Sequence, residues 1–330
     1  MIELINVKKI YTEGANPAVN EVNLQFGEGE ITILVGPSGC GKTTMLKMLN
    51  RIEEPTDGQI MLNGQSILEL DPLELRRDIG YVIQHIGLFP HMTIADNVAT
   101  VPRLKKWPKE KINKRVSEML NLVSIPENFR RRLPGELSGG QQQRVGVARA
   151  LAGDPPVMLM DEPFGALDPI TREHLQNEFL KIQQKIQKTI VFVTHDIEEA
   201  FKMGERIVVM NQGRVVQFDT PLNILSKPAS EFVSDLTGSD RGLRYLSLIP
   251  VGSLLESEEI EQEKPERHKE MDEGFYDGVS LNVDDSLKNA LNLMVEYGAS
   301  SIPVVDDTGT TIGHLSVYSL VQGMKKLWTS

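Results

Sequence analysis

Hydrophobic positions near the N-terminus follow the alternation and the short apolar runs that are typical of β-strands. Segments 2–11 and 19–26 have strand composition, and 31–35 is continuously apolar, as in a strand buried on both faces. A glycine-rich turn at 36–42 separates this strand from apolar residues at helical spacing in 43–52. The pattern predicts a buried strand that leads through a tight turn into a helix.

The middle of the chain changes to a helical pattern and then back to strands. Residues 71–128 are polar with helical spacing and are interrupted by prolines. Strand patterns at 157–160 and 189–194 flank a helical pattern at 169–187, and 206–218 has the pattern of a hairpin. Strands that alternate with helices predict an α/β fold with a parallel sheet and crossover helices.

The composition changes after Asp240. Residues 256–273 contain nine acidic and three basic side chains, which is typical of a solvated linker. Regular patterns then return as a helix, two strands and a second helix at 286–297, 301–305, 311–316 and 317–326. We therefore expect a large domain at 1–240, an acidic linker at 241–274 and a small α+β domain at 275–330.

Composition limits the classes of function. The chain has 330 residues and a net charge of -11, which argues against wholesale nucleic-acid binding. Its one cysteine excludes an internal disulfide and fits a reducing compartment. No stretch of 18 apolar residues is present, and the N-terminus lacks the features of a signal peptide. If the protein works at a membrane, we expect it to do so through a partner.

Residues 36–43 fit the phosphate-loop pattern G-x-x-x-x-G-K-[ST]. Glycines there let backbone N–H groups turn toward a phosphate at the positive end of the following helix. In such a loop Lys42 reaches the β- and γ-phosphate oxygens, and the Thr43 hydroxyl ligates Mg²⁺. The candidate phosphate-binding residues are Gly36, Pro37, Ser38, Gly39, Cys40, Gly41, Lys42, Thr43 and Thr44.

The apolar strand at 157–160 ends in two carboxylates, Asp161 and Glu162. Asp161 at the tip of a strand can hold Mg²⁺ near Thr43, directly or through water. Glu162 can polarise the attacking water. Many buried strands end in aspartate, so this pattern gains its significance from the phosphate loop earlier in the chain.

Residues 137–141, Leu-Ser-Gly-Gly-Gln, precede a helical run. Ser138 and Gln141 have the spacing of a capping box, and Gly139 and Gly140 leave the start of the helix open to an anion. An ordinary capped helix is the alternative interpretation. A second phosphate site of this kind makes sense if it faces an ATP held by another subunit.

In this order, the motifs resemble the nucleotide-binding domain of ABC transporters over residues 1–238. The resemblance implies a P-loop NTPase fold with a RecA-like core, an antiparallel β subdomain and a helical subdomain. It implies binding of ATP and Mg²⁺, ATP hydrolysis, and two such domains that enclose two ATP molecules. The implied partners are a second ATPase subunit, a transmembrane permease and a substrate-binding protein or domain, at the cytoplasmic face of the cell membrane.

The same resemblance assigns roles to individual residues. Glu162 is similar to the catalytic carboxylate, and Gln84 to the Q-loop glutamine, with a catalytic and a metal-binding role. His195 resembles the switch histidine that contacts the γ-phosphate, and Asp168 the D-loop aspartate. Tyr11 is placed like the aromatic residue that stacks on adenine, although a core position suits an isolated tyrosine nearly as well.

Apolar side chains follow Gln84, among them Leu88 and Phe89. They either pack inward, as most such residues do, or line a groove for a short helix of the permease. The position next to Gln84 favours the groove.

A narrower resemblance joins segments 71–77, 80–84, 86–94 and 163–170 to importers of quaternary amines. Those importers carry glycine betaine, carnitine or choline, and close relatives carry ergothioneine. An importer of another solute and a soluble ABC ATPase of DNA repair or translation are the alternatives. The second class carries long coiled-coil insertions or two ATPase domains, and neither is visible here. A nucleotide sensor without turnover is disfavoured by the presence of both Glu162 and His195.

Residues 275–326 resemble a single CBS motif, carried by 301–306 and 313–316. CBS motifs normally occur in pairs, and the ribose-binding aspartate of the family is replaced by Ser319. We expect the tails of two copies to pair, either as a structural module or as a site for a regulatory nucleotide.

Overall fold

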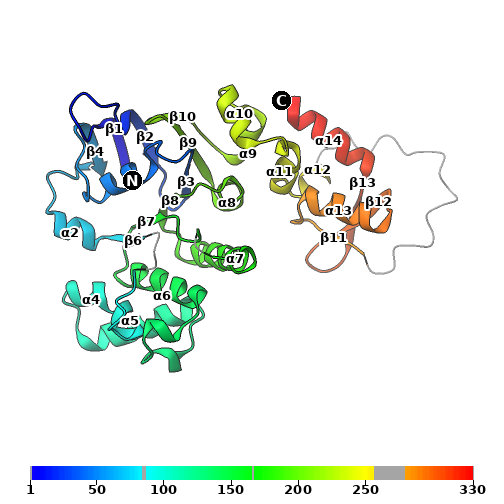
Figure 1. The fold of residues 1–330 in the computed structure, drawn as a ribbon. Helices are drawn as coiled ribbons and strands as arrows, with labels where there is room; N and C mark the ends of the chain where they lie inside the picture. The colour runs from blue at the N-terminus through cyan, green and yellow to red at the C-terminus, as the bar shows by residue number, and fades with distance from the viewer. Residues whose placement is uncertain (1, 84–86, 166, 256–278, 330) are drawn as a thin grey trace, which may run out of the picture. The chain divides into compact units, whose positions relative to one another are not determined.

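The computed structural model describes residues 2–83, 87–165, 167–255 and 279–329. The chain forms two compact units, Met1–Thr220 and Pro221–Ser330. The first contains both larger sheets and the second contains the CBS-like segment (Figure 1). Among the described helices, none is both long and apolar enough to cross a bilayer.

An antiparallel sheet of four strands begins the first unit, in the order β2-β1-β4-β5. Its strands are β1 (Ile2–Lys9), β2 (Val19–Phe26), β4 (Asp57–Leu62) and β5 (Gln65–Ser66). Buried residues alternate with exposed ones through most of β2 because only one face of the sheet packs on the core. This is the antiparallel subdomain that the sequence predicts.

A sheet of six strands in the order β10-β9-β3-β8-β7-β6 forms the centre of the unit. Neighbours from β9 to β6 pair in parallel, and β10 is an antiparallel edge strand. The strands are β3 (Ile31–Val35), β6 (Ile79–Val82), β7 (Val157–Asp161), β8 (Thr189–Val193), β9 (Arg206–Asn211) and β10 (Arg214–Asp219). Parallel strands place their carboxyl ends at one edge, where ligands bind in such folds.

Strand β6 corrects the helical expectation for residues 71–128. It is short, and Gly80 within it approaches a helix so closely that an added Cβ would lie 2.9 Å from the carbonyl oxygen of Ala150. Tertiary packing therefore decides its conformation. Helices occupy much of the rest of this range, as α2 (Pro72–Arg77), α3 (Ile94–Val98), α4 (Thr100–Leu104) and α5 (Lys109–Leu122).

Three further helices of the first unit are α6 (Gly139–Ala152), α7 (Pro169–Ile186) and α8 (Ile197–Met203). Helices α4, α5 and α6 gather at the end of the unit opposite the antiparallel strands, with the parallel strands between (Figure 1). The RecA-like core and the helical subdomain predicted from the sequence are thus confirmed.

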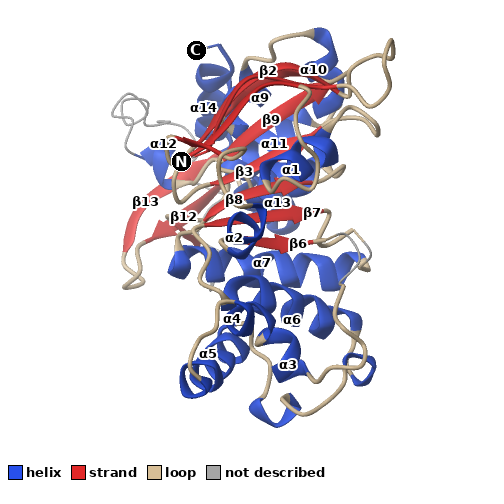
Figure 2. Ribbon diagram, turned by 90° about the vertical axis from the view of Figure 1, so that its left-hand side faces the viewer, coloured by secondary structure: helices blue, strands red, loops and turns tan. Residues whose placement is uncertain are grey.

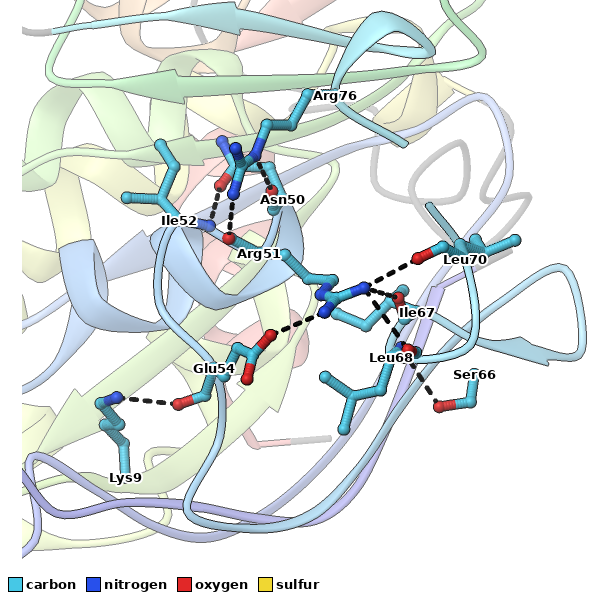
Figure 3. A network of polar contacts seen from close by, with 10 residues as sticks. All are labelled: Lys9, Asn50, Arg51, Ile52, Glu54, Ser66, Ile67, Leu68, Leu70 and Arg76. Atoms are coloured by element: carbon cyan, nitrogen blue, oxygen red, sulfur yellow. Dashed lines mark hydrogen bonds and ion pairs between the residues drawn. The ribbon is translucent and has the colours of Figure 1, made fainter. Parts of the chain in front are cut away.

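Helix α1 (Lys42–Leu49) packs into the main core, where Met45, Leu46 and Met48 are buried with side chains of both sheets. Just beyond it, Arg51 donates from Nη1 to the carbonyl oxygens of Ile67 at 3.2 Å and Leu70 at 2.8 Å (Figure 3). These charge-assisted bonds fix the end of α1 to the segment that follows β5.

The second unit begins with α9 (Pro221–Ser226), α10 (Glu231–Thr237), α11 (Arg241–Leu248) and α12 (Gly252–Leu255). Its sheet has the order β11-β12-β13, and the CBS-like elements are β11 (Leu281–Asn282), α13 (Leu287–Tyr297), β12 (Ser301–Val305), β13 (Thr311–Ser316) and α14 (Val317–Thr329). The two strands predicted at 301–305 and 311–316 have these bounds.

Residues 241–255, expected to belong to the linker, are folded onto the CBS-like part. The amide of Leu287 donates to the carbonyl of Ile249 at 2.9 Å, and that of Val251 to Asp285 at 2.7 Å. Apolar residues of α11, such as Leu246, are buried there, so the segment gives the single CBS-like motif a partner surface within its own chain. The acidic stretch 256–273 lies outside the described residues.

Candidate functional site

The phosphate loop has a backbone that only glycine can adopt at two positions. Gly36 and Gly41 have φ values of 148° and 106°. A Cβ at Gly36 would lie 2.1 Å from the carbonyl oxygen of Met210, and one at Gly41 would lie 2.2 Å from that of Ala18. Neighbouring backbone therefore fixes both the sequence and the path of the turn.

The loop ends at the N-terminus of α1, where Gly41 caps the helix without a side-chain hydrogen bond. The free N–H groups of the first turn of α1, which form the positive end of the helix dipole, therefore point toward the loop. Lys42 is 7% exposed, and its Nζ donates to the carbonyl oxygens of Gly36 at 2.7 Å and Pro37 at 3.0 Å. A cation and a helix N-terminus thus share one turn, which is the chemistry of an anion site.

Thr43 and Asp161 meet across the edge of the sheet. The Thr43 hydroxyl donates to Oδ1 of Asp161 at 3.1 Å. Burial raises the pKa of the Asp161 carboxyl, which the Thr43 hydrogen bond opposes and the charge of Glu162 reinforces. The structure therefore brings together the hydroxyl and the carboxylate that the sequence assigns to a metal.

Glu162 and His195 form a second pair at the same edge. Nδ1 of His195 lies 3.1 Å from Oε2 of Glu162, and the side chains are 61% and 20% exposed. The Glu162 amide donates to the Val193 carbonyl at 2.9 Å, so the end of β7 is tied to the end of β8. Glu162 has a φ of 44°, a left-handed conformation that is uncommon for a residue other than glycine. This turn aims its carboxylate at His195.

The predicted capping box at the start of α6 is confirmed. The amide of Gln141 donates to the Ser138 hydroxyl at 3.3 Å, and the Ser138 amide donates to the Gln141 side chain at 3.1 Å. Ser138 and Gly139 are exposed. Helix α6 lies in the helical part of the unit, whereas α1 lies against the strands (Figure 2). The structure does not bring this motif to the phosphate loop of its own chain.

Asp168 caps α7 by accepting a hydrogen bond from the Thr171 amide at 3.0 Å, and this bond lowers the pKa of its carboxyl. Tyr11 is 56% exposed, which overturns the core interpretation of this residue. Its hydroxyl lies 3.3 Å from that of Thr44 on α1, so the ring stands beside the phosphate-loop helix. Gln84 lies outside the described residues.

The apolar loop after Gln84 is exposed at Phe89, whose residual accessibility is 40%, so this side chain does not belong to the core. Asn97, which is fully buried, organises the loop by accepting from the Phe89 amide at 2.8 Å and donating to the Met92 carbonyl at 3.1 Å. Arg149 of α6 donates to the Gly87 carbonyl at 2.7 Å and stacks on Phe89 with 5.7 Å to the ring centroid. This loop is therefore joined to the helix that begins at Ser138.

Sequence reasoning missed two residues of the site, Arg172 and Asp196. Asp196 follows His195 directly and caps α8, where it accepts from the Glu198 amide at 2.9 Å. Arg172 lies on the first turn of α7, four residues after Asp168. The sequence features that could have indicated them were the position of Asp196 at the start of a helix and that of Arg172 one turn after Asp168.

Comparison with known proteins agrees with this geometry. Residues 19–165 match the family described as ABC transporter, and residues 276–326 match the CBS domain. The chain is 48% identical to the "Glycine betaine/carnitine/choline transport ATP-binding protein OpuCA" of Bacillus subtilis, over 99% of this chain and 81% of that protein. It is 47% identical to the "Glycine betaine uptake system ATP-binding protein YehX" of Escherichia coli, over 97% of this chain and 99% of that protein.

A solved structure described as a dimeric post-hydrolysis state of the ATP-binding cassette MJ0796 bound to ADP and Pi is also similar. It is 40% identical with a TM-score of 0.60, over 67% of this chain and 99% of that one. The phosphate loop, the Thr43–Asp161 and Glu162–His195 pairs and the full-length similarity support one assignment. The chain belongs to the ATP-hydrolysing, ATP-binding subunits of ABC transporters.

Proposed function

We propose that the chain drives the import of a quaternary amine such as glycine betaine, carnitine, choline or the related ergothioneine, together with a permease and a substrate-binding protein or domain. The names of the two relatives, which are similar over 97% and 99% of this chain, support the solute class. The catalytic part rests on one observation, the convergence of Thr43, Asp161, Glu162 and His195 at the carboxyl edge of the sheet.

The residues at this edge fit a magnesium ion. Thr43 and Asp161 supply a hydroxyl and a carboxylate oxygen 3.1 Å apart, and both are hard ligands. An ion held by these two side chains would take its remaining ligands from phosphate and water. Gln84 is the further proposed ligand. When bound, Mg²⁺ would neutralise charge on the β- and γ-phosphate oxygens.

The side chains of the edge then have separate tasks. The loop amides and Lys42 bind the phosphates, and Tyr11 stacks on the adenine. Glu162 orients the attacking water and accepts its proton on a carboxylate oxygen, and Gln84 is proposed to share this catalytic role. His195 holds Glu162 through Nδ1 and contacts the γ-phosphate, so the nucleophile and the phosphate are placed by the same pair.

A second copy of the chain completes each nucleotide site. The motif at 138–141 is exposed at Ser138 and Gly139, and its helix α6 lies apart from α1, which follows the phosphate loop (Figure 2). This arrangement suits recognition of a nucleotide held by another copy. Asp168, which caps α7, is proposed to contribute to the same site between the two copies. A homodimer supplies two such sites related by symmetry.

The permease docks on the loop that carries Leu88 and Phe89. Phe89 is exposed at 40% although it is large and apolar, and Asn97 and Arg149 hold the loop in one conformation. An ordered apolar surface of this kind suits a short helix of a partner protein. The chain then lies at the cytoplasmic face of the cell membrane as a peripheral subunit.

The tails pair across the dimer, although α11 and α12 already cover one side of the CBS-like motif. Helix α14 still exposes Val317, Tyr318 and Val321 at 41%, 60% and 54%. Ser319 is 9% exposed and hydrogen-bonded to Ser316 at 2.8 Å, so its hydroxyl is engaged within the chain. This favours a dimerising module over a nucleotide site at that position.

Replacement of Glu162 by Gln tests the catalytic assignment. Loss of a general base should lower ATP turnover by about 10²- to 10⁴-fold while ATP binding persists. The protein should then accumulate as an ATP-bound dimer, measured by size exclusion with labelled ATP. Glu173→Gln, at an exposed carboxylate of α7, is the matched control. Wild-type turnover in Glu162→Gln would remove Glu162 from the mechanism.

The solute is tested with vesicles that contain the chain and its permease. ATP hydrolysis and uptake of labelled glycine betaine, carnitine, choline and ergothioneine are measured, with a polyamine and an amino acid as controls. Stimulation by the controls alone would refute the quaternary-amine assignment and leave the ATPase assignment intact.

A further inference from the structure

Two turns carry the pair Glu162 and His195, and each turn continues into a helix. Glu162 directly follows β7, and the chain continues through Leu167 to the start of α7. His195 follows β8 and precedes Asp196, which caps α8. The 3.1 Å contact between the two side chains therefore depends on how far apart these turns are held.

Arg172 contacts both turns with one guanidinium group. Nη2 donates to the Leu167 carbonyl at 3.1 Å, and Nη1 donates to Oδ2 of Asp196 at 3.3 Å. The side chains of Arg172 and Asp196 are only 29% and 31% exposed, so water shields this ion pair incompletely. The planar guanidinium fixes the directions of both bonds together.

We propose that Arg172 is a positioning residue that sets the distance between the turn after Glu162 and the turn that bears His195. Its Nη2 bond holds Leu167 in the turn that follows Glu162, and its Nη1 bond holds Asp196 next to His195. Without it, the two turns lose a side-chain bridge that is separate from the contact between Glu162 and His195. The inference rests on the proposed roles of Glu162 and His195 in hydrolysis.

Other contacts hold α7 and α8 together independently of Arg172. Gln176 donates to Glu199 at 3.0 Å, and both side chains are almost completely buried. Lys202 and Glu173 form an exposed ion pair between the same helices at 3.7 Å. Loss of Arg172 should therefore release the two turns without separating the helices, which predicts an effect on catalysis rather than on folding.

The test compares Arg172→Ala with Lys202→Ala, which removes an ion pair between the same helices. We expect Arg172→Ala to lower kcat by about 10- to 100-fold, since a misplacement of about 1 Å can cost this much. The KM for ATP and the thermal transition should stay close to wild type. Arg172→Lys should restore part of kcat, and Lys202→Ala should leave both constants unchanged.

A double-mutant cycle with His195→Ala separates positioning from a general structural role. If Arg172 acts through His195, Arg172→Ala should change single-turnover rates by less than about twofold in the His195→Ala background. The same loss in both backgrounds, or a wild-type kcat in Arg172→Ala, would overturn the inference. Wild-type turnover in both Glu162→Gln and His195→Ala would instead refute the proposed function.

Asp196→Asn provides the test if Arg172→Ala does not fold. An asparagine keeps an oxygen for the Glu198 amide, so the cap of α8 persists, while the acceptor for Arg172 is lost. The same fall in kcat is expected. Full activity of a folded Asp196→Asn protein would contradict the role of this bridge.

Discussion

The hydroxyl of Thr43 donates to the carboxylate of Asp161 at 3.1 Å, although 118 positions separate the two residues in the chain. The contact forms because β3 and β7 lie on either side of β8, with their carboxyl ends at one edge of the sheet. Thr43 follows β3 by way of the phosphate loop, and Asp161 ends β7. The contact between Thr43 and Asp161 therefore forms only when the sheet brings the phosphate loop next to the end of β7.

Asp161→Asn should stabilise the folded protein in the absence of Mg²⁺ and nucleotide. Burial raises the pKa of Asp161, so the folded state binds the proton more tightly than the unfolded state. Stability from this group is present at acidic pH and is lost as the pH rises through the folded pKa. The variant, which has no charge to bury, should melt at a higher temperature near pH 7, and the difference should shrink toward pH 4.

The same substitution should raise the Mg²⁺ concentration that supports ATP hydrolysis, by about 10- to 100-fold if Asp161 orients the ion's ligands. Asp78→Asn, at an exposed carboxylate paired with Lys105, serves as the control for both measurements. An unchanged melting temperature at every pH would contradict the cost of burial. An unchanged Mg²⁺ dependence would exclude Asp161 from the metal site.

A bulky adduct on Cys40 should prevent ATP binding by steric exclusion. The thiol is 4% exposed and its sulfur lies inside the phosphate loop, 3.7 Å from Nζ of Lys42. We expect complete modification with N-ethylmaleimide, verified by mass spectrometry, to abolish binding of labelled ATP. Bound ATP should slow the modification. Cys40→Ala should bind ATP before and after treatment, and ATP binding by a fully alkylated wild-type protein would refute the prediction.

Polar substitution of Leu88 and Phe89 should weaken assembly with the permease and leave ATP binding intact. Phe89 is already 40% exposed, so Phe89→Gln should change the free energy of unfolding by about 0.5 kcal/mol or less. Co-purification with the permease is the measurement. Leu68→Gln, an exposed leucine of the antiparallel subdomain, is the control. Loss of the thermal transition would favour the core interpretation of Leu88.

Cysteines on α14 should cross-link two copies of the chain. Because Cys40 is the single cysteine, Cys40→Ala gives a background in which one new thiol can be placed. If the tails pair through α14, Tyr318→Cys or Val321→Cys should form disulfide-linked dimers under mild oxidation. Val295→Cys on α13, where the native side chain is 76% exposed, is the control site. Dimers that form equally well from Val295→Cys, or from none of the three, would argue against this pairing.

The sequence determined the local features of the protein. The strands at 19–26, 31–35, 301–305 and 311–316 have the predicted bounds. Buried and more exposed residues alternate along 301–305 and most of 19–26, and every residue of 31–35 is buried. The capping box of Ser138 and Gln141 was likewise predictable, since both partners lie within one turn of a helix. Motif order was sufficient to recognise the ATPase class.

Tertiary structure decided what depends on residues far apart in the chain. Strand β6 lay hidden in a polar, helical pattern, because its conformation comes from pairing with β7 and from the close approach of α6 at Gly80. The folding of 241–255 onto the CBS-like motif likewise depends on hydrogen bonds to residues 283–287. Local periodicity reports which face of a segment is buried and does not report its partner.

The catalytic edge shows the same division. Glu162 and His195 could each be named from the residues around them, but their 3.1 Å contact required β7 and β8 to be neighbours in the sheet. Arg172 had no signal beyond its place on α7, because its role arises from two turns that meet only when both helices are packed. A chain encodes its chemical groups locally, whereas the distances between them are set by the order of strands and the packing of helices.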